Sequence, residues 1–173
     1  MRTIELTKGF VAVVDEEDYD RLTAYRWQVN GRQGKQRRCA VRNVKLSSGA
    51  NQMIYMHREV LQVPASVQVD HINCDALDNR KANLRPATNS QNNANTRIAR
   101  TNTSGFKGVS WIARIRKWQA RIKVLGSARY LGVYANPEDA ARVYDSAARE
   151  AFGSFARLNF PRVGEQTARW EIN

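Results

Sequence analysis

The stretch of sequence that decides the architecture runs from residue 70 to residue 92 and reads DHINCDALDNRKANLRPATNSQN. The residues before it, VPASVQVDH, predict an extended segment that brings Asp70 and His71 to the edge of a strand. A polar loop is expected to follow, from Ile72 to about Pro86. The stretch therefore predicts a strand and a long polar loop.

A short helix is expected next, beginning at Thr88 or Ser90 and carrying Gln91, Asn92 and Asn95. Asparagine is a weak helix former, so tertiary contacts or a metal would have to stabilise this helix. The amide oxygens of this helix, together with the neighbouring pair Asp70 and His71 at the strand edge, form an oxygen-rich set that suits magnesium or manganese. Hydrolysis of a phosphodiester needs such a cation and a base that deprotonates water.

The charge of the chain points to a polyanionic partner. The 173 residues carry a formal net charge of +12, and such an excess concentrates nucleic acid around a protein. Residues 80–136 contain no acidic side chain. The basic residues in that span are Arg80, Lys81, Arg85, Arg97, Arg100, Lys107, Arg114, Arg116, Lys117, Arg121, Lys123 and Arg129.

A membrane partner is not expected, because no apolar run approaches the roughly 20 residues that span a bilayer. The first residues, MRTIELTKGF, also lack the apolar core of a signal peptide. We therefore expect a cytoplasmic protein of a bacterial or phage-infected cell. Cys39 and Cys74 are too few for a disulfide framework and are expected to be reduced and structural.

The first 65 residues predict a small sheet as a scaffold. Ile4 and Leu6 alternate with polar residues, and Phe10–Val14 is a short apolar run. Further candidate strands, separated by turn signals, are Trp27–Val29, Ala40–Val44 and Met53–Met56. Asp15 is expected to cap a helix that begins in the acidic stretch after it. The segment from Met56 to Leu61 is predicted to be a short helix or a strand end.

The last third predicts three strands followed by a helix. Strands are expected over Gly108–Ile112, Trp118–Val124 and Arg129–Tyr134. In the second, Trp118, Ala120, Ile122 and Val124 share one face, while Gln119, Arg121 and Lys123 share the other. Asn136 and Pro137 begin a helix with an alanine-rich face that ends at Gly153.

The segment 70–92 closely resembles the HNH family of nucleases, in particular homing endonucleases of the phage type. The matching residues are Asp70-His71, Asn83-Leu84-Arg85, and Thr88 followed four positions later by Asn92. Two departures are Cys74, where the family often has glycine, and Asn92, where other branches have histidine. Met56–Glu59 also resembles the segment that leads into the motif, and we interpret its His57 as structural.

The resemblance implies a role for each matched residue. His71 would be the general base, while Asp70 and Asn92 would bind one Mg²⁺ or Mn²⁺ ion. Asn83 would tie the loop and orient His71, and Arg85 would contact phosphate. A lone Asp-His pair in an asparagine-rich stretch is more often a surface loop with caps and turns, but the spacing over the whole segment disfavours that interpretation.

Residues from about Ser104 to Pro161 resemble the Apetala-type, ethylene-response-factor DNA-binding domain first known from plants. The motifs that carry the resemblance are GFKGVSW, KWQARI, YLGVY, EDAARVYDSAA and LNFP. In that family the sheet lies in the major groove of duplex DNA. The candidate contacts by position are Trp111, Arg114, Arg116, Trp118, Arg121, Lys123 and Arg129. Trp118 alternates with apolar residues and is also a candidate for the core.

The predicted fold class is α+β: a small β-rich scaffold with a ββα-metal motif, followed by a three-stranded antiparallel sheet packed on one helix. The expected domains are a nuclease domain over 1–95, a basic linker over 96–104, a DNA-binding domain over 105–161 and a tail over 162–173. Thr96–Ser104 is assigned as the linker because it is polar, basic and without apolar periodicity.

These patterns predict a metal-dependent endonuclease of the homing type that acts on double-stranded DNA as a monomer or homodimer. A monomer with one active centre would nick, whereas a dimer would cut both strands. Two alternatives remain open. One is a DNA-binding regulator with a degenerate nuclease domain, and the other is an RNA-directed nuclease or an RNA-binding structural protein, which the sheet module disfavours.

Overall fold

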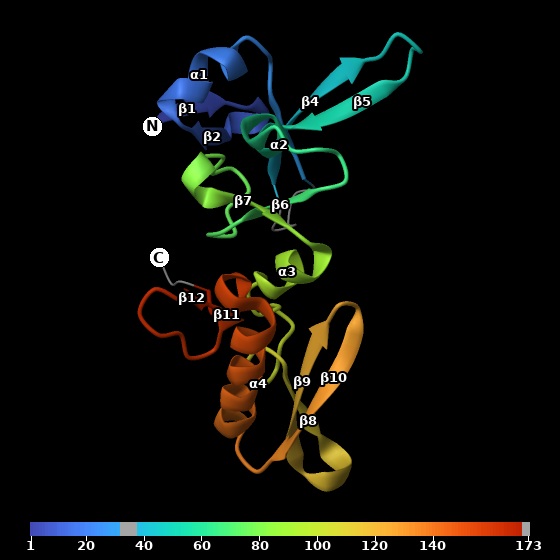
Figure 1. Cartoon of the computed structure of the whole chain (residues 1–173), viewed down its shortest axis with the longest axis vertical. Coiled ribbons are helices and arrows are strands. Elements are labelled where there is room, and N and C mark those ends of the chain that lie inside the picture. Colours follow the sequence, from blue (N-terminus) through green and yellow to red (C-terminus); the bar gives the residue numbers. More distant parts are fainter. Residues whose placement is uncertain (32–37, 171–173) are drawn as a thin grey trace. The chain divides into compact units, whose positions relative to one another are not determined.

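The computed structural model describes residues 1–31 and 38–170. These residues form two compact units, Met1–Ala87 and Thr88–Asn173, and each is described by itself. Both units combine small sheets with helices (Figure 1), which confirms the predicted α+β class. The division between them falls at 87/88, within the segment that was expected to form one nuclease domain.

The first unit is built from short strands and two helices rather than one sheet. Its strands are β1 (Arg2–Glu5), β2 (Val11–Val14), β3 (Gln28–Asn30), β4 (Cys39–Lys45), β5 (Asn51–Tyr55), β6 (Gln68–His71) and β7 (Leu84–Ala87), and its helices are α1 (Glu16–Thr23) and α2 (Met56–Leu61). β1 pairs with β2, the sheet order β3-β4-β5 forms a meander, and β6 pairs with β7.

One apolar core holds the first unit together. Ala12, Val14, Leu22, Trp27 and Met56 are each at most 2% exposed and belong to a single buried cluster. The Trp27 indole satisfies its buried N–H by donating to the Leu22 carbonyl at 2.8 Å. β1, β2, α1 and α2 therefore share one core.

The β6–β7 hairpin replaces the end of the predicted loop. Residues 84–86 were expected to belong to the loop, but β7 pairs antiparallel with β6, and Asp70 lies opposite Arg85. The single-turn helix η2 (Lys81–Asn83) leads into β7. Pro86 is accommodated in β7, consistent with the tolerance of edge strands for proline. The irregular part of the loop is thus confined to residues 72–80.

The second unit confirms the predicted strands and helix. Its elements are α3 (Asn89–Ala94), β8 (Val109–Ile112), η3 (Ala113–Ile115), β9 (Lys117–Val124), β10 (Ser127–Tyr134), α4 (Pro137–Phe152), η4 (Gly153–Phe155), β11 (Arg157–Leu158) and β12 (Gln166–Thr167). The strand order is β10-β9-β8, and α4 contributes Ala140, Ala141, Tyr144 and Ala148 to cores shared with the sheet (Figure 1). Neither α4 nor another helix among the described residues is long and apolar enough to cross a membrane.

Residues 94–98, which span the end of the expected nuclease domain and the start of the expected linker, are held by other parts of the second unit. The Lys107 ammonium donates one hydrogen bond to the Ala94 carbonyl and another to the Thr96 carbonyl, the second at 2.7 Å. Arg157 donates to the side chain of Asn95 at 2.9 Å, and Ile98 donates its N–H to the Ala168 carbonyl at 2.8 Å. These bonds attach the end of α3 and the residues after it to the second unit.

Candidate functional site

The Asp70–His71 pair lies at the end of β6. Asp70 is 3% exposed, and its carboxylate is met by the guanidinium of Arg85, with Nε and Nη2 each 2.9 Å from Oδ2. Because Asp70 and Arg85 are directly opposite in the hairpin, the ion pair follows from the strand register. Arg85, predicted to contact phosphate, is therefore engaged with the predicted metal ligand.

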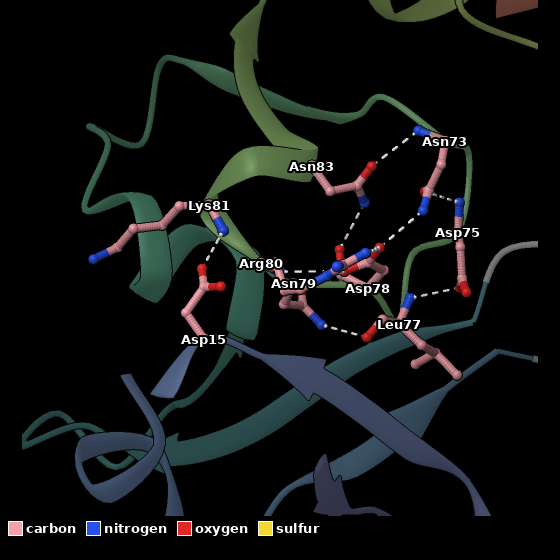
Figure 2. Close-up of polar contacts among 9 residues, drawn as sticks. All are labelled: Asp15, Asn73, Asp75, Leu77, Asp78, Asn79, Arg80, Lys81 and Asn83. Carbon is pink, nitrogen blue, oxygen red and sulfur yellow. Dashed lines mark hydrogen bonds and ion pairs between the residues drawn. The ribbon is translucent and has the colours of Figure 1, made fainter. Parts of the chain in front are cut away.

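A network of side-chain bonds fixes the loop that follows His71 (Figure 2). Asn83 spans it, because its Oδ1 accepts from the Asn73 N–H at 3.0 Å and its Nδ2 donates to the Asp78 carbonyl at 2.8 Å. The Asp78 carboxylate accepts from Asn73 at 2.9 Å and from both Arg80 Nε and Nη2, at 2.8 and 2.6 Å. These bonds to the charged Arg80 hold the pKa of Asp78 below its ordinary value.

The same loop is attached to the N-terminal part of the first unit. The Val13 N–H donates to the Leu77 carbonyl at 2.8 Å, and the Asn79 N–H donates to the Val13 carbonyl at 2.7 Å. Asp15, predicted to cap α1, makes no such side-chain cap. Its carboxylate instead accepts from the Lys81 N–H at 2.7 Å (Figure 2). Asp15 thus occupies the predicted N-cap position of α1, but its side chain bonds to this distant donor instead of to the helix.

Cys74 occupies a backbone conformation that favours glycine. Its φ is +62°, which lies in the left-handed region. The turn begins with a bond from the Cys74 N–H to the His71 carbonyl at 2.9 Å. This conformation explains why glycine is frequent at this position in the family pattern. The loop therefore forms this turn with a non-glycine residue, at the cost of backbone strain at Cys74.

Burial is the main influence on His71 and lowers its pKa. A side-chain hydrogen bond with Asn79 and the charges of Asp70, Asp75 and Asp78 oppose this shift. Asn79 is 0% exposed, and sequence reasoning did not single it out. The Asn79 amide donates to the Leu77 carbonyl at 3.1 Å, and Asn83 makes two bonds to the loop backbone, so both asparagines help to fix the loop beside His71.

His57 of α2 packs against His71. The two rings are 5.1 Å apart at an interplanar angle of 86°, and the other side of His57 meets Tyr55 at 5.3 Å. Burial, and then the charges of His71 and Arg58, lower the pKa of His57 to about 3. The His57 imidazole is therefore neutral at pH 7 and forms part of the wall around His71.

Asn92, the other predicted metal ligand, lies in α3 of the second unit. The N-terminus of α3 is a capping box, in which the Thr88 hydroxyl accepts from Gln91 N–H at 3.2 Å and the Gln91 side chain accepts from Thr88 N–H at 2.8 Å. This arrangement confirms Thr88 as the helix start. It explains how an asparagine-rich segment forms a helix.

The donor set of Asp70 and Asn92 fits a hard divalent ion, since both side chains offer oxygen. Within residues 1–31 and 38–170, no group of three or more His, Cys, Asp or Glu side chains is placed to hold a metal.

The open face of the second unit's sheet is cationic. Arg121 and Lys123 are exposed on β9, and they alternate with Ala120 and Ile122, which are at most 4% exposed and pack towards α4. This arrangement confirms the predicted division of the strand into two faces. Tyr130, 57% exposed, lies opposite Arg121 in β10 and was missed by sequence reasoning.

Three of the predicted contacts do not share that face. Trp111 lies opposite Trp118, with ring centroids 4.9 Å apart, and Arg129 lies opposite buried Ile122. Directly opposed residues project to the same side of a sheet, so these three side chains lie on the side that packs against α4. Arg114 and Arg116 are exposed in the connection between β8 and β9.

Known proteins are similar to this chain over its nuclease-like segment and over further parts of its length. A family model described as HNH endonuclease matches residues 62–94. A protein of Acanthamoeba polyphaga mimivirus, "Uncharacterized HNH endonuclease L560", is 29% identical over 152 residues, 88% of this chain and 76% of that protein. Protein 3.8 of Escherichia phage T7 is 32% identical over 96 residues, 56% of this chain and 78% of that protein.

A third relative is similar to a shorter part of the chain. The "Ethylene-responsive transcription factor ERF010" of Arabidopsis thaliana is 43% identical over 64 residues, 34% of this chain and 32% of that protein. No solved structure matches the chain. The matched HNH segment contains Asp70, His71 and Asn83, whose arrangement is described above. On these grounds the chain belongs to the HNH endonuclease family and is a nuclease.

Proposed function

We propose that this chain is a metal-dependent DNA endonuclease of the homing type, held on duplex DNA by its second unit. The observation that carries the proposal is the pair of buried Asp70 and half-buried His71 at the end of β6, beside a loop that Asn83 and Asp78 fix from within. A surface loop with incidental Asp and His residues would have little reason to bury the carboxylate and to fix the backbone that follows the pair.

His71 is the general base that takes a proton from the attacking water, and Asn83 orients it by tying the loop that follows. Asp70 would hold the divalent ion, Mg²⁺ or Mn²⁺, and the sequence pattern alone assigns Asn92 as a further ligand. When bound, the ion supplies charge stabilisation to the scissile phosphate and the leaving oxygen. His57 packs edge-on against the His71 ring and restricts its movement.

DNA binding is assigned to the cationic face of the β8–β10 sheet. Arg121 and Lys123 supply the charge that neutralises phosphates, and Arg121 can in addition contact a guanine edge. Tyr130 joins them on the same face. A covalently attached binding unit raises the effective concentration of DNA at the nuclease centre. The proposal therefore gives the net charge of +12 a defined function.

Cleavage of supercoiled plasmid tests the proposal. The wild type with Mg²⁺ or Mn²⁺ is expected to produce nicked or linear DNA, and EDTA is expected to abolish the reaction. His71→Ala is expected to lose about 100-fold or more in rate, as removal of a general base does, while its affinity for DNA stays unchanged. Tight, salt-sensitive binding without cleavage under any divalent ion would instead establish the regulator.

Two neighbouring asparagines of α3 form a matched pair for the metal assignment. Asn92→Ala is expected to reduce cleavage and to raise the metal concentration needed for half-maximal rate. Asn93→Ala changes an exposed residue in the same helix and is expected to cleave like the wild type. Equal rates for the two variants would remove Asn92 from the ligand set.

A further inference from the structure

The carboxylate expected to bind the metal already has a cation beside it. Both Arg85 Nε and Nη2 lie 2.9 Å from Asp70 Oδ2. The side chains of Arg85 and Asp70 are 16% and 3% exposed, so water screens the pair only weakly. The cross-strand register places the two residues opposite each other. The guanidinium is thus a built-in neighbour of Asp70.

The other carboxylates near His71 do not supply a second negative ligand. Asp78 is held by two bonds from Arg80 and one from Asn73. Asp75 accepts the Leu77 N–H at 3.0 Å as part of the loop turn. Among the described residues no larger cluster of potential metal ligands is present. The protein alone therefore offers a divalent ion one carboxylate whose charge is already neutralised.

From this geometry we infer that Arg85 lowers the affinity of the DNA-free centre for divalent ions, so that metal and DNA bind cooperatively. The inference rests on the proposed function, because it takes Asp70 as a ligand. Without DNA, the guanidinium repels an incoming dication while holding the carboxylate in place. Bound DNA adds a phosphate, whose negative charge offsets Arg85 and whose oxygen is a further ligand of the kind Mg²⁺ prefers.

The consequence is a coupling between two ligands at one site. If DNA raises the affinity for metal by some factor, metal raises the affinity for DNA by the same factor. Removal of the Arg85 charge should strengthen metal binding in the absence of DNA. The factor by which DNA raises the metal affinity should therefore become smaller. Arg85 is a positioning residue in this account, since it acts through Asp70.

Binding of Mn²⁺ to the full chain, measured at pH 7.5 from the EPR signal of the free ion, tests the inference. All proteins carry His71→Ala, which prevents cleavage, and Asp70→Asn in that background defines binding elsewhere. Arg85→Gln is expected to bind Mn²⁺ about tenfold more tightly than its parent without DNA. Arg85→Lys keeps the charge and is expected to stay close to the parent.

Arg80→Gln is the matched control, because it also removes an arginine paired with a buried aspartate of the first unit. Its affinity for Mn²⁺ is expected to stay within about twofold of the parent. An Arg85→Gln protein whose DNA-free affinity is unchanged or weaker than the parent's would overturn the inference. An equal increase in Mn²⁺ affinity in Arg80→Gln would also overturn the inference, because the loss of any positive charge near the loop would then explain the result.

A second measurement does not depend on Arg85→Gln being folded. The His71→Ala parent is titrated with Mn²⁺ in the presence and absence of a saturating duplex. Tighter Mn²⁺ binding with DNA is required, and equal affinity in both titrations would contradict the inference. The two proposals fail in different ways: absence of cleavage by the wild type contradicts the nuclease function, whereas the coupling is read from metal binding in a protein that does not cleave.

Discussion

The loop after His71 and the sheet of the second unit are both rich in cations, but the structure uses them differently. In the first unit, Arg80 and Arg85 are paired with Asp78 and Asp70. In the sheet, Arg121 and Lys123 face solvent from a span, residues 80–136, that contains no acidic residue. Net charge therefore indicates a nucleic-acid partner, whereas the placement of each cation decides whether it is available to that partner.

The two regions also obtain their order in different ways. The sheet follows from alternating apolar and polar residues that pack against an alanine-rich helix face. The loop has no such periodicity and is ordered by hydrogen bonds among Asn73, Asp78, Arg80 and Asn83 (Figure 2). Close packing should make the sheet sensitive to added volume, and the loop should be sensitive to the loss of one polar group.

The largest expected effect is on the packed region. A Cβ on Gly108 would lie 2.0 Å from the ring of Tyr144, so Gly108→Ala is expected to destabilise the second unit by about 4 kcal/mol and to weaken DNA binding. Gly105 has nearly the same φ, +76° against +75°, but no atom within 4 Å of the added Cβ. Gly105→Ala is therefore the matched control, with an expected cost of about 1 kcal/mol.

Thermal denaturation of both glycine variants, followed by tryptophan fluorescence, measures the difference. If the two substitutions lowered the melting temperature equally, backbone strain alone would explain the effect. Close helix-to-sheet packing at Gly108 would then not be the property that distinguishes this region.

The loop should be broken by removing polar groups. Asn83→Ala leaves the Asn73 N–H and the Asp78 carbonyl without their partner in Asn83, and the expected cost is about 3 kcal/mol. Plasmid cleavage should fall with it, while the affinity for DNA should hold because the sheet is untouched. Asn43→Ala, at an exposed position of β4, is the control. A parallel loss of affinity and cleavage in Asn83→Ala would contradict the separation of the two functions.

The periodic region was also the more predictable one. The strands of the second unit, the helix from Pro137 to Phe152 and its end at Gly153 agree with the sequence pattern. Thr88 was identifiable as a cap because the capping box is local in sequence. These elements depend on residues within a few positions of one another, which a single sequence displays.

What could not be predicted depends on interactions between distant positions. Asp15 bonds to Lys81, and Arg85 to Asp70, because of how strands pair. In β10, a register shift between Tyr130 and Gly132 changes which residues share a face. Counting alternate positions from Tyr134 therefore assigns Arg129 and Tyr130 to the wrong sides. The complete burial of Asn79 gave no signal either, because it results from the fold around this loop.

The placement of cations on the sheet leads to a smaller expected effect. A variant with both Arg121→Ala and Lys123→Ala is expected to bind duplex DNA about 2 kcal/mol more weakly. The slope of log affinity against log salt should fall by about one for each phosphate that the variant no longer neutralises. Arg129→Ala removes the same charge from the side that carries Ile122 and should cost less than either single variant. If Arg129→Ala reduced the affinity as much as Arg121→Ala or Lys123→Ala does, Arg129 would belong to the DNA-binding surface.

The smallest expected effect concerns the polar wall of the nuclease centre. Burial lowers the pKa of His57 to about 3. As pH falls below about 6.5, His57 therefore becomes protonated in the unfolded chain but stays neutral in the native protein. Stability is therefore expected to decrease as pH drops from about 6.5 towards about 3. Because solvent screening reduces the effect, His57 should account for about 1 kcal/mol between pH 7 and pH 5.

Urea denaturation of the wild type and His57→Phe at both pH values measures this contribution of His57. The decrease in stability on acidification should be smaller in the variant, because phenylalanine takes up no proton in the unfolded chain. An identical decrease in both proteins would mean that the native state takes up the proton at His57. The packing of His57 against His71 could not then be a rigid, dry contact.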